Sequence, residues 1–119
     1  MSWEGMTSMT QLTSITTEQT FTETIAADPA EGIIVHVKVD FVATPTDNAI
    51  IAVYGGMNSS ASWSDNPILE FTIDNGDDDV WIPFTLYGWR HYKIGVRRDG
   101  STDTLTDADC RYEPDGIAA

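Results

Sequence analysis

Positive charge and cysteine are both scarce in this chain of 119 residues. Six Lys and Arg stand against 19 Asp and Glu, which gives a formal charge of −13 and a pI near 4.1. Such a surface repels DNA, RNA and anionic lipid, so we expect no direct binding to nucleic acid or to a membrane. The single cysteine, Cys110, excludes an internal disulfide framework and a cysteine-cluster zinc site. A small buried apolar side chain is its expected role.

Long apolar runs and helical periodicity are missing as well. No stretch approaches the roughly 18 apolar residues that a membrane helix needs. The N-terminus lacks the basic start and apolar segment of a signal peptide, which predicts synthesis in a cytoplasm without export by that route. The length fits one domain, and a hydrophobic content of 41% is enough for a real core.

The chain consists of short β-branched and aromatic runs separated by Gly, Pro, Asn and Asp, which predicts an all-β protein. We expect an N-terminal arm over residues 1–12 and one antiparallel β-sandwich domain over residues 13–119. About seven or eight short strands fit both an immunoglobulin-like and a jelly-roll sandwich. The expected strands cover residues 14–25, 33–43, 49–56, 68–73, 80–87, 91–97 and 102–112.

The clearest strand is "IIVHVKVDFVA", residues 33–43. Its alternation places the aliphatic residues and Phe41 on one face, and His36, Lys38 and Asp40 on the other, solvated face. The run at 49–56 is apolar on both faces, as in a central strand covered on both sides.

The runs 68–73 and 80–87 flank "DNGDDD", and an Asn-Gly step between two alternating runs predicts a β-hairpin. The second run places Val80, Ile82, Phe84 and Leu86 inward. Pro83 has no N–H to donate, so this strand should have a free edge there or carry a bulge.

Catalytic and metal-binding patterns find little support. His36 and His91 fall on outward faces, and neither belongs to a nucleophile motif or a metal-ligand pair, so we predict no enzyme activity and no cofactor. Asp74, Asp77 and Asp79 offer oxygen atoms of the kind that calcium prefers. Their spacing does not match an EF-hand, and a solvated turn explains them, so no metal site is expected.

Basic residues are concentrated in "RHYKIGVRR", residues 90–98, which holds four of the six positive charges. Alternation places Tyr92, Ile94 and Val96 inward. The outward charges either pair within the subunit or meet an acidic partner surface. The candidate interface residues here are Arg90, Lys93 and Arg97. The candidate carboxylates within the subunit are Asp103, Asp107 and Asp109.

Apolar residues in unusual places give further interface candidates. Trp81 and Tyr87 alternate outward from their strand, and are either packed under a loop or form a contact surface. Trp3, Met6 and Met9 lie in the N-terminal arm, where adaptable apolar side chains suit docking onto a partner.

The C-terminal stretch "YGWRHYKIGVRRDGSTDTLTDADCRYEPDGI" resembles the last strands of small β-sandwich proteins from tailed-phage particles. The strand "YKIGVRRDG", the Thr/Asp-rich turn and the final "CRYEPDG" carry the likeness, over about a quarter of the chain. The resemblance implies a virion component such as a capsid decoration (cement) protein. Small sandwiches of that class often form trimers and grip the shell or a neighbouring subunit with a terminal arm.

The sequence therefore predicts a virion structural protein, made in the host cytoplasm, that binds copies of itself and the major capsid protein. The alternative is a carbohydrate-binding sandwich, free or part of a phage fibre or tail. In that case an aromatic row such as Trp81 and Tyr87 would stack on sugar rings, and an acidic loop would hold structural calcium.

Overall fold

The computed structural model describes residues 6–57, 63–100 and 105–114, and it confirms an all-β sandwich of two antiparallel sheets. The first, called the β5 sheet, has the strand order β1-β10-β5-β8, with β2 also paired to β10. The second, the β6 sheet, has the order β3-β9-β6-β7, with β4 also paired to β9. The strands are β1 Thr7–Ser8, β2 Leu12–Ile15, β3 Thr20–Phe21, β4 Ile25–Ala26, β5 Ile33–Asp40, β6 Ala49–Gly56, β7 Leu69–Ile73, β8 Ile82–Leu86, β9 His91–Arg98 and β10 Leu105–Pro114.

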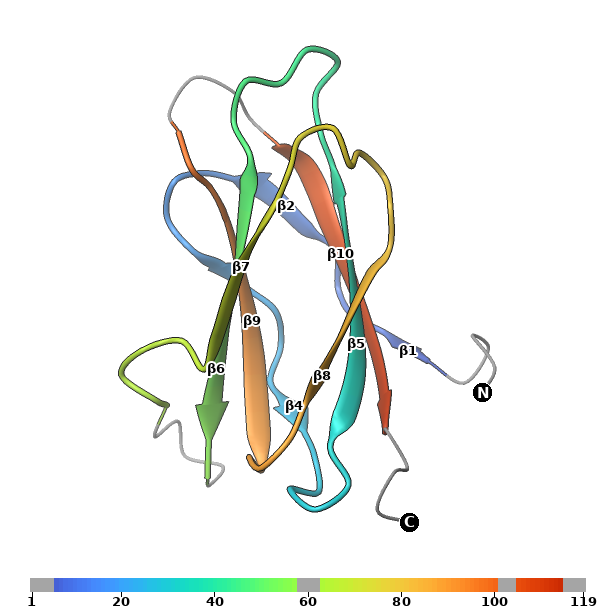
Figure 1. The fold of residues 1–119 in the computed structure, drawn as a ribbon, viewed down its shortest axis with the longest axis vertical. Helices are drawn as coiled ribbons and strands as arrows, with labels where there is room; N and C mark the ends of the chain where they lie inside the picture. Colours follow the sequence, from blue (N-terminus) through green and yellow to red (C-terminus); the bar gives the residue numbers. More distant parts are fainter. Residues whose placement is uncertain (1–5, 58–62, 101–104, 115–119) are drawn as a thin grey trace.

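The strand pairs are nested, which decides between the two sandwich topologies. The innermost pair is β6 with β7, followed outward by β5 with β8, β3 and β4 with β9, and β1 and β2 with β10. The chain thus runs like one long hairpin whose halves wrap into two sheets, as a jelly roll does. Figure 1 shows the two layers edge-on.

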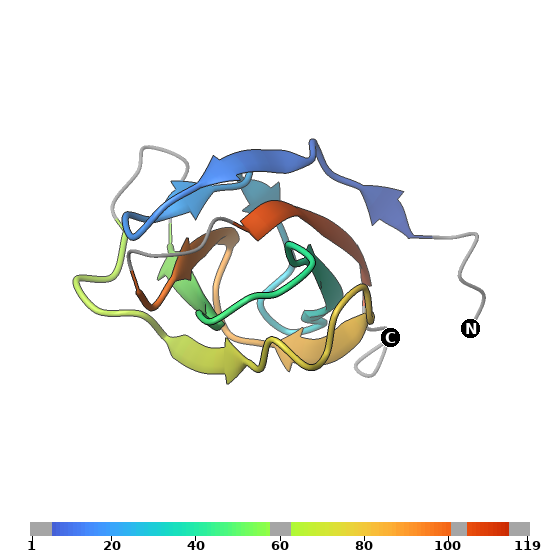
Figure 2. The ribbon, with the colours of Figure 1, turned by 90° about the horizontal axis from the view of Figure 1, so that it is seen from above.

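The core lies between the sheets and follows the period-two pattern of the sequence. The alternate residues from Ile33 to Phe41 are all buried, and so are Tyr92, Ile94 and Val96 of β9. Strand β6 lies between β9 and β7, so the prediction of a central strand is confirmed. Seen from above, the two sheets enclose this interior (Figure 2).

The predicted hairpin of residues 68–73 and 80–87 is wrong. Strand β7 pairs with β6, whereas β8 pairs with β5 in the other sheet. The connection still makes an Asn-Gly turn, with the Asp77 N–H donating to the Asp74 carbonyl at 2.9 Å, but it leads from one layer to the other. Val80 lies in this connection and is 49% exposed, so its predicted inward position is also wrong.

Two further expectations require correction. The run 14–25 is not one strand, because the chain crosses there from the β5 sheet to the β6 sheet as β2, β3 and β4. His36 lies on the outer face of β5 but is only 4% exposed, because side chains of that face cover it.

The sandwich is open along two sides, where the edge strands of the two sheets run. Among the strands that the structure describes, β8 pairs with β5 alone, so the predicted free edge at Pro83 is confirmed. Strand β7 is the corresponding edge of the β6 sheet, and both figures place β7 and β8 on the same flank. Within the described ranges, the structure has no helix that is long and apolar enough to cross a membrane.

Candidate binding surfaces

The structure separates the predicted interface residues into three places. Lys93 and Arg97 project from β9 on the outer face of the β6 sheet, and Trp81 lies over the outer face of the β5 sheet. Tyr87 and Arg90 belong to the connection between β8 and β9 at one end of the sandwich. They therefore do not form one continuous surface.

On the β6 sheet, the ammonium group of Lys93 is surrounded by aromatic rings. Its Nζ atom lies 4.2 Å from the ring centroid of Phe21, 4.8 Å from that of Trp63 and 5.7 Å from that of Tyr54. Phe21 and Tyr54 also meet edge to face, with centroids 5.7 Å apart. We call Lys93 and these three rings the lysine–aromatic cluster. Each such cation–π contact contributes about 0.5 to 1 kcal/mol when exposed, so together they fix the position of the charge.

Backbone register explains how these side chains meet. Tyr54 of β6 is directly opposite Lys93 of β9, and Phe21 of β3 is opposite Gly95, two residues further along β9. A Cβ atom at Gly95 would come within 3.0 Å of the Phe21 ring, so glycine at this position leaves room for the ring. Trp63 is brought over β6 by the returning loop, through a bridge to Gly56.

Arg97, the second predicted interface charge on β9, has an acidic partner within the same sheet. An Arg97 guanidinium nitrogen lies 3.7 Å from a carboxylate oxygen of Glu70 on β7. Two of the three carboxylates predicted as partners within the subunit do not fit, because β10 belongs to the other sheet and pairs with β5 there. This excludes Asp107 and Asp109 as cross-strand neighbours of β9; Asp103 lies outside the described residues.

On the β5 sheet, Trp81 lies among cations of its own sheet. The guanidinium carbon of Arg111 is 3.9 Å from the Trp81 ring centroid, and the Lys38 ammonium is 4.9 Å from it. Lys38 also lies 3.4 Å from an Asp79 carboxylate oxygen. Trp81 is thus half-buried against neighbouring strands, rather than tucked under a loop.

The same cluster explains why His36 is buried. Arg111 Nε donates a hydrogen bond to His36 Nδ1 at 3.1 Å, and the Trp81 ring lies 6.4 Å away, centroid to centroid. Burial, and next the charge of Arg111, lower the pKa of His36. The imidazole therefore serves as a neutral hydrogen-bond acceptor within the sheet.

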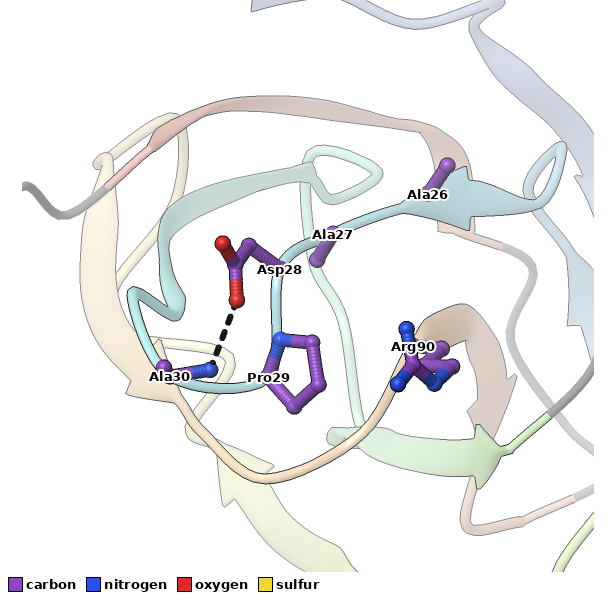
Figure 3. A pocket seen from close by; sticks show the side chains of 6 residues that line it. All are labelled: Ala26, Ala27, Asp28, Pro29, Ala30 and Arg90. Atoms are coloured by element: carbon purple, nitrogen blue, oxygen red, sulfur yellow. Dashed lines mark hydrogen bonds between the residues drawn. The ribbon is translucent and has the colours of Figure 1, made fainter.

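At the end of the sandwich, Arg90 borders a shallow groove formed with residues 26–30. Figure 3 shows its side chain on the far side of Pro29 from the Asp28 carboxylate, which accepts a hydrogen bond from the Ala30 N–H at 2.9 Å. Within the described part of the chain, Arg90 forms no ion pair within 4.0 Å. Tyr87 is 43% exposed, and its ring rests on Gly32.

Part of the predicted N-terminal arm belongs to the sandwich in this structure. Residues 7 and 8 form β1 beside β10, and the Met9 N–H donates to the Cys110 carbonyl at 3.0 Å. Met9 packs against the core, and Met6 is half-buried. Trp3 lies outside the described residues.

Three of the four aspartates in the acidic loop 74–79 have a partner. Asp74 Oδ1 accepts a hydrogen bond from the Gly76 N–H, and Asp78 Oδ1 accepts one from the Phe41 N–H at 2.8 Å. Asp79 pairs with Lys38, while Asp77 is exposed. In the described ranges, no three His, Cys, Asp or Glu side chains are placed to hold a metal ion together.

Cys110 lies in the core at 3% exposure. Burial, with a smaller contribution from Asp109, raises the pKa of its thiol to about 12. A thiol that stays protonated and covered is a poor nucleophile and a poor partner for disulfide exchange.

Sequence reasoning missed the residues that build the two outer faces. Phe21 of β3 and Tyr54 of β6 supply rings of the lysine–aromatic cluster, and Arg111 of β10 covers His36. Strand parity identifies Tyr54 and Arg111 as outward-facing, whereas Phe21 shares its parity in the expected run 14–25 with the buried Ile15 and Ile25. Their convergence depends on strand neighbours that the sequence does not reveal.

Comparison with known proteins supports the fold. No protein-family model and no curated protein matches the sequence. A solved structure of Bacillus endospore appendages, described as a novel family of disulfide-linked pili, is similar with a TM-score of 0.52 and 14% sequence identity. The likeness covers 90% of this chain and 82% of that chain. At this identity it shows a shared fold only.

Proposed function

We propose that this chain is a structural subunit that acts by binding protein surfaces, as a capsid decoration protein of a tailed phage does. The observation that carries the proposal is the lysine–aromatic cluster on the outer face of the β6 sheet. Phe21, at 38% exposure, is one of the few large apolar side chains that the described surface exposes. Exposed apolar residues with a fixed charge are typical of contact surfaces.

The charge balance favours an acidic partner surface for this face. In the described part of the chain, the Lys93 ammonium forms no ion pair within 4.0 Å and is held by rings alone. In a protein of charge −13, a lysine that contacts aromatic rings and, among the described residues, no carboxylate distinguishes this face from the rest of the surface. An acidic region of the shell or of another subunit would supply the missing countercharge.

The similarity to a pilus structure is compatible with a role in assembly, although the means must differ. The endospore appendages are described as disulfide-linked. Here the one cysteine is buried, with its thiol pKa raised to about 12. Assembly of this chain would therefore be non-covalent.

Particle binding tests the proposal. The protein is mixed with shells assembled from the major capsid protein of a tailed phage, the proposed partner, and binding is measured by co-sedimentation. Lys93→Glu should reduce binding severalfold, and Arg90→Glu, the same charge change at an exposed position off this face, should not. Failure of the unmodified protein to bind the shells overturns the decoration role.

A sugar-binding module is the second candidate, and the same cluster supports it. Aromatic rings on a sheet face stack on sugar rings, and a fixed ammonium pairs with an acidic sugar. Calorimetry against neutral and acidic glycans, with and without calcium, separates the two candidates. Saturable glycan binding that Phe21→Ala removes, with no binding to shells, would establish the second function in place of the first.

A further inference from the structure

Three of the four sheet edges carry a feature that hinders the addition of another strand. Strand β8 contains Pro83, which has no N–H to donate to a new ladder. The β3 and β4 edge is interrupted, because residues 22–24 separate two strands of two residues each. The edge formed by β1 and β2 contains a bulge, since three residues, 9–11, span the two residues 109 and 110.

Strand β7 has none of these protections. It runs without interruption from Leu69 to Ile73, contains neither Pro nor Gly, and among the described residues pairs with β6 alone. Its one charged side chain, Glu70, is drawn back over the sheet toward Arg97, at 3.7 Å. Natural proteins usually protect an edge of this kind, so an unprotected one indicates a partner strand.

The apolar rim beside this edge is also incompletely covered. Leu69 and Phe71 of β7, with Ile82 and Phe84 of β8, pack against the core but stay partly exposed. Phe71 and Phe84 meet edge to face, with centroids 5.3 Å apart, where the two sheets come together. Figure 2 shows β7 and β8 side by side on this flank. A strand added to β7 would cover part of the rim.

We propose that two copies of this chain pair through their β7 strands, antiparallel and about a two-fold axis. Inward side chains of one copy must lie opposite inward side chains of the other, so the two-fold axis must be centred on a residue rather than between two residues. In this short strand the possible centres are residues 70, 71 and 72. A centre on Glu70 places Glu70 opposite its own copy, and a centre on Thr72 places it opposite Asp74. The centre on Phe71 avoids both repulsions and sets Glu70 against Thr72 and Leu69 against Ile73.

This self-complementarity selects a second copy as the occupant of the edge. A two-fold contact needs the same patch to fit itself, and the five-residue strand does so in one register. Two subunits of charge −13 repel each other, so salt should strengthen the contact by screening. The dimer would be one step in the proposed assembly, so its biological role rests on the proposed function.

Cysteine cross-linking in the full-length protein tests both the contact and its register. Glu70→Cys and Thr72→Cys proteins are prepared separately, mixed and mildly oxidised. The mixture should form covalent dimers several times faster than either protein alone, because residue 70 faces residue 72 across the axis. Thr85→Cys, at an exposed position on the Pro-containing edge of β8, gives the background rate. Cys110 is buried and does not compete.

Sedimentation of the unmodified protein provides the second measurement. The dimer fraction should rise with protein concentration and with salt. Equal cross-linking rates in the mixture, in the single variants and in Thr85→Cys overturn the proposal, and so does a monomer at every concentration and salt tested. Shell binding is measured separately, so loss of the decoration role and loss of the β7 contact are distinguishable.

Discussion

At the scale of single residues, the outer face of the β5 sheet shows how a polar strand face becomes partly buried. His36 accepts a hydrogen bond from Arg111 at 3.1 Å, and Arg111 in turn lies 3.9 Å from the Trp81 ring centroid. The guanidinium uses its edge for the imidazole and its plane for the indole, as arginine commonly does. The neutral state of His36 follows from this arrangement.

This state predicts a pH dependence of stability. Because the pKa of His36 is lowered on folding, its stabilising contribution is present above the unfolded-state pKa of about 6.5 and is lost as the pH falls toward the folded-state value. Urea denaturation should give a lower free energy of unfolding at about pH 5.5 than at about pH 7.5. His36→Gln should show a smaller decrease over that interval. An unchanged slope in the variant would contradict the assigned role.

At the scale of elements, the pairing of β10 with β5 brings two carboxylates together. Asp107 lies directly opposite Asp40 in the register. Burial raises the pKa of both groups; repulsion from Asp40 adds to the shift of Asp107, and repulsion from Asp78 and Asp79 to that of Asp40. The sheet tolerates this pair because the core side chains on the inner face fix the register of β10 against β5. That register then places the two aspartates opposite each other.

Removal of one charge should therefore stabilise the protein. Asp107→Asn is expected to raise the free energy of unfolding at neutral pH by about 0.2 to 1 kcal/mol, the range for cross-strand pairs. A raised carboxyl pKa destabilises the fold above that pKa, and the effect is relieved as the pH falls through it. The gain should accordingly shrink as the pH falls toward 4 and the Asp107 carboxylate of the parent protein takes up a proton. Destabilisation at neutral pH would show that Asp107 has a favourable partner.

The N-terminal strands give a second prediction at this scale. Deletion of residues 2–11 removes β1 and the core contact of Met9 and should cost about 1 to 2 kcal/mol of stability. Deletion of residues 2–5 leaves these contacts in place and serves as the matched control. Shell binding by the shorter deletion then tests Trp3 without a change in the sandwich. Equal stability of the two deletions would show that β1 contributes nothing.

At the scale of the whole molecule, the proposed contacts respond to salt in opposite directions. The lysine–aromatic cluster should meet an acidic partner, so salt weakens that contact. The β7 contact joins two acidic subunits through largely uncharged backbone, so salt strengthens it.

A charge-reversed variant separates these effects. Lys93→Glu with Arg97→Glu should keep the β-sheet circular dichroism spectrum and lose shell binding at low salt. Its shell binding is compared with that of Arg90→Glu, and its dimer fraction is followed by sedimentation across salt. Full shell binding by the double variant would show that these charges serve only their own sheet.

The sequence by itself determined the all-β class, the places of the six longer strands, β5 to β10, and the inward faces of β5 and β9. Period two is a local property, and a strand with one apolar face must turn it toward the core wherever its neighbours lie. Pro83 marked a free edge for an equally local reason, since it lacks an N–H.

Only the tertiary structure decided which strands pair, and with them the candidate sites. Residues 68–73 and 80–87 have the pattern of a hairpin, yet they pair with β6 and β5 in different sheets. The pairing energy depends on burial against strands distant in sequence. His36 is covered by a residue 75 positions away, and the rings around Lys93 come from three segments. Such convergence depends on sheet order, which no local pattern encodes.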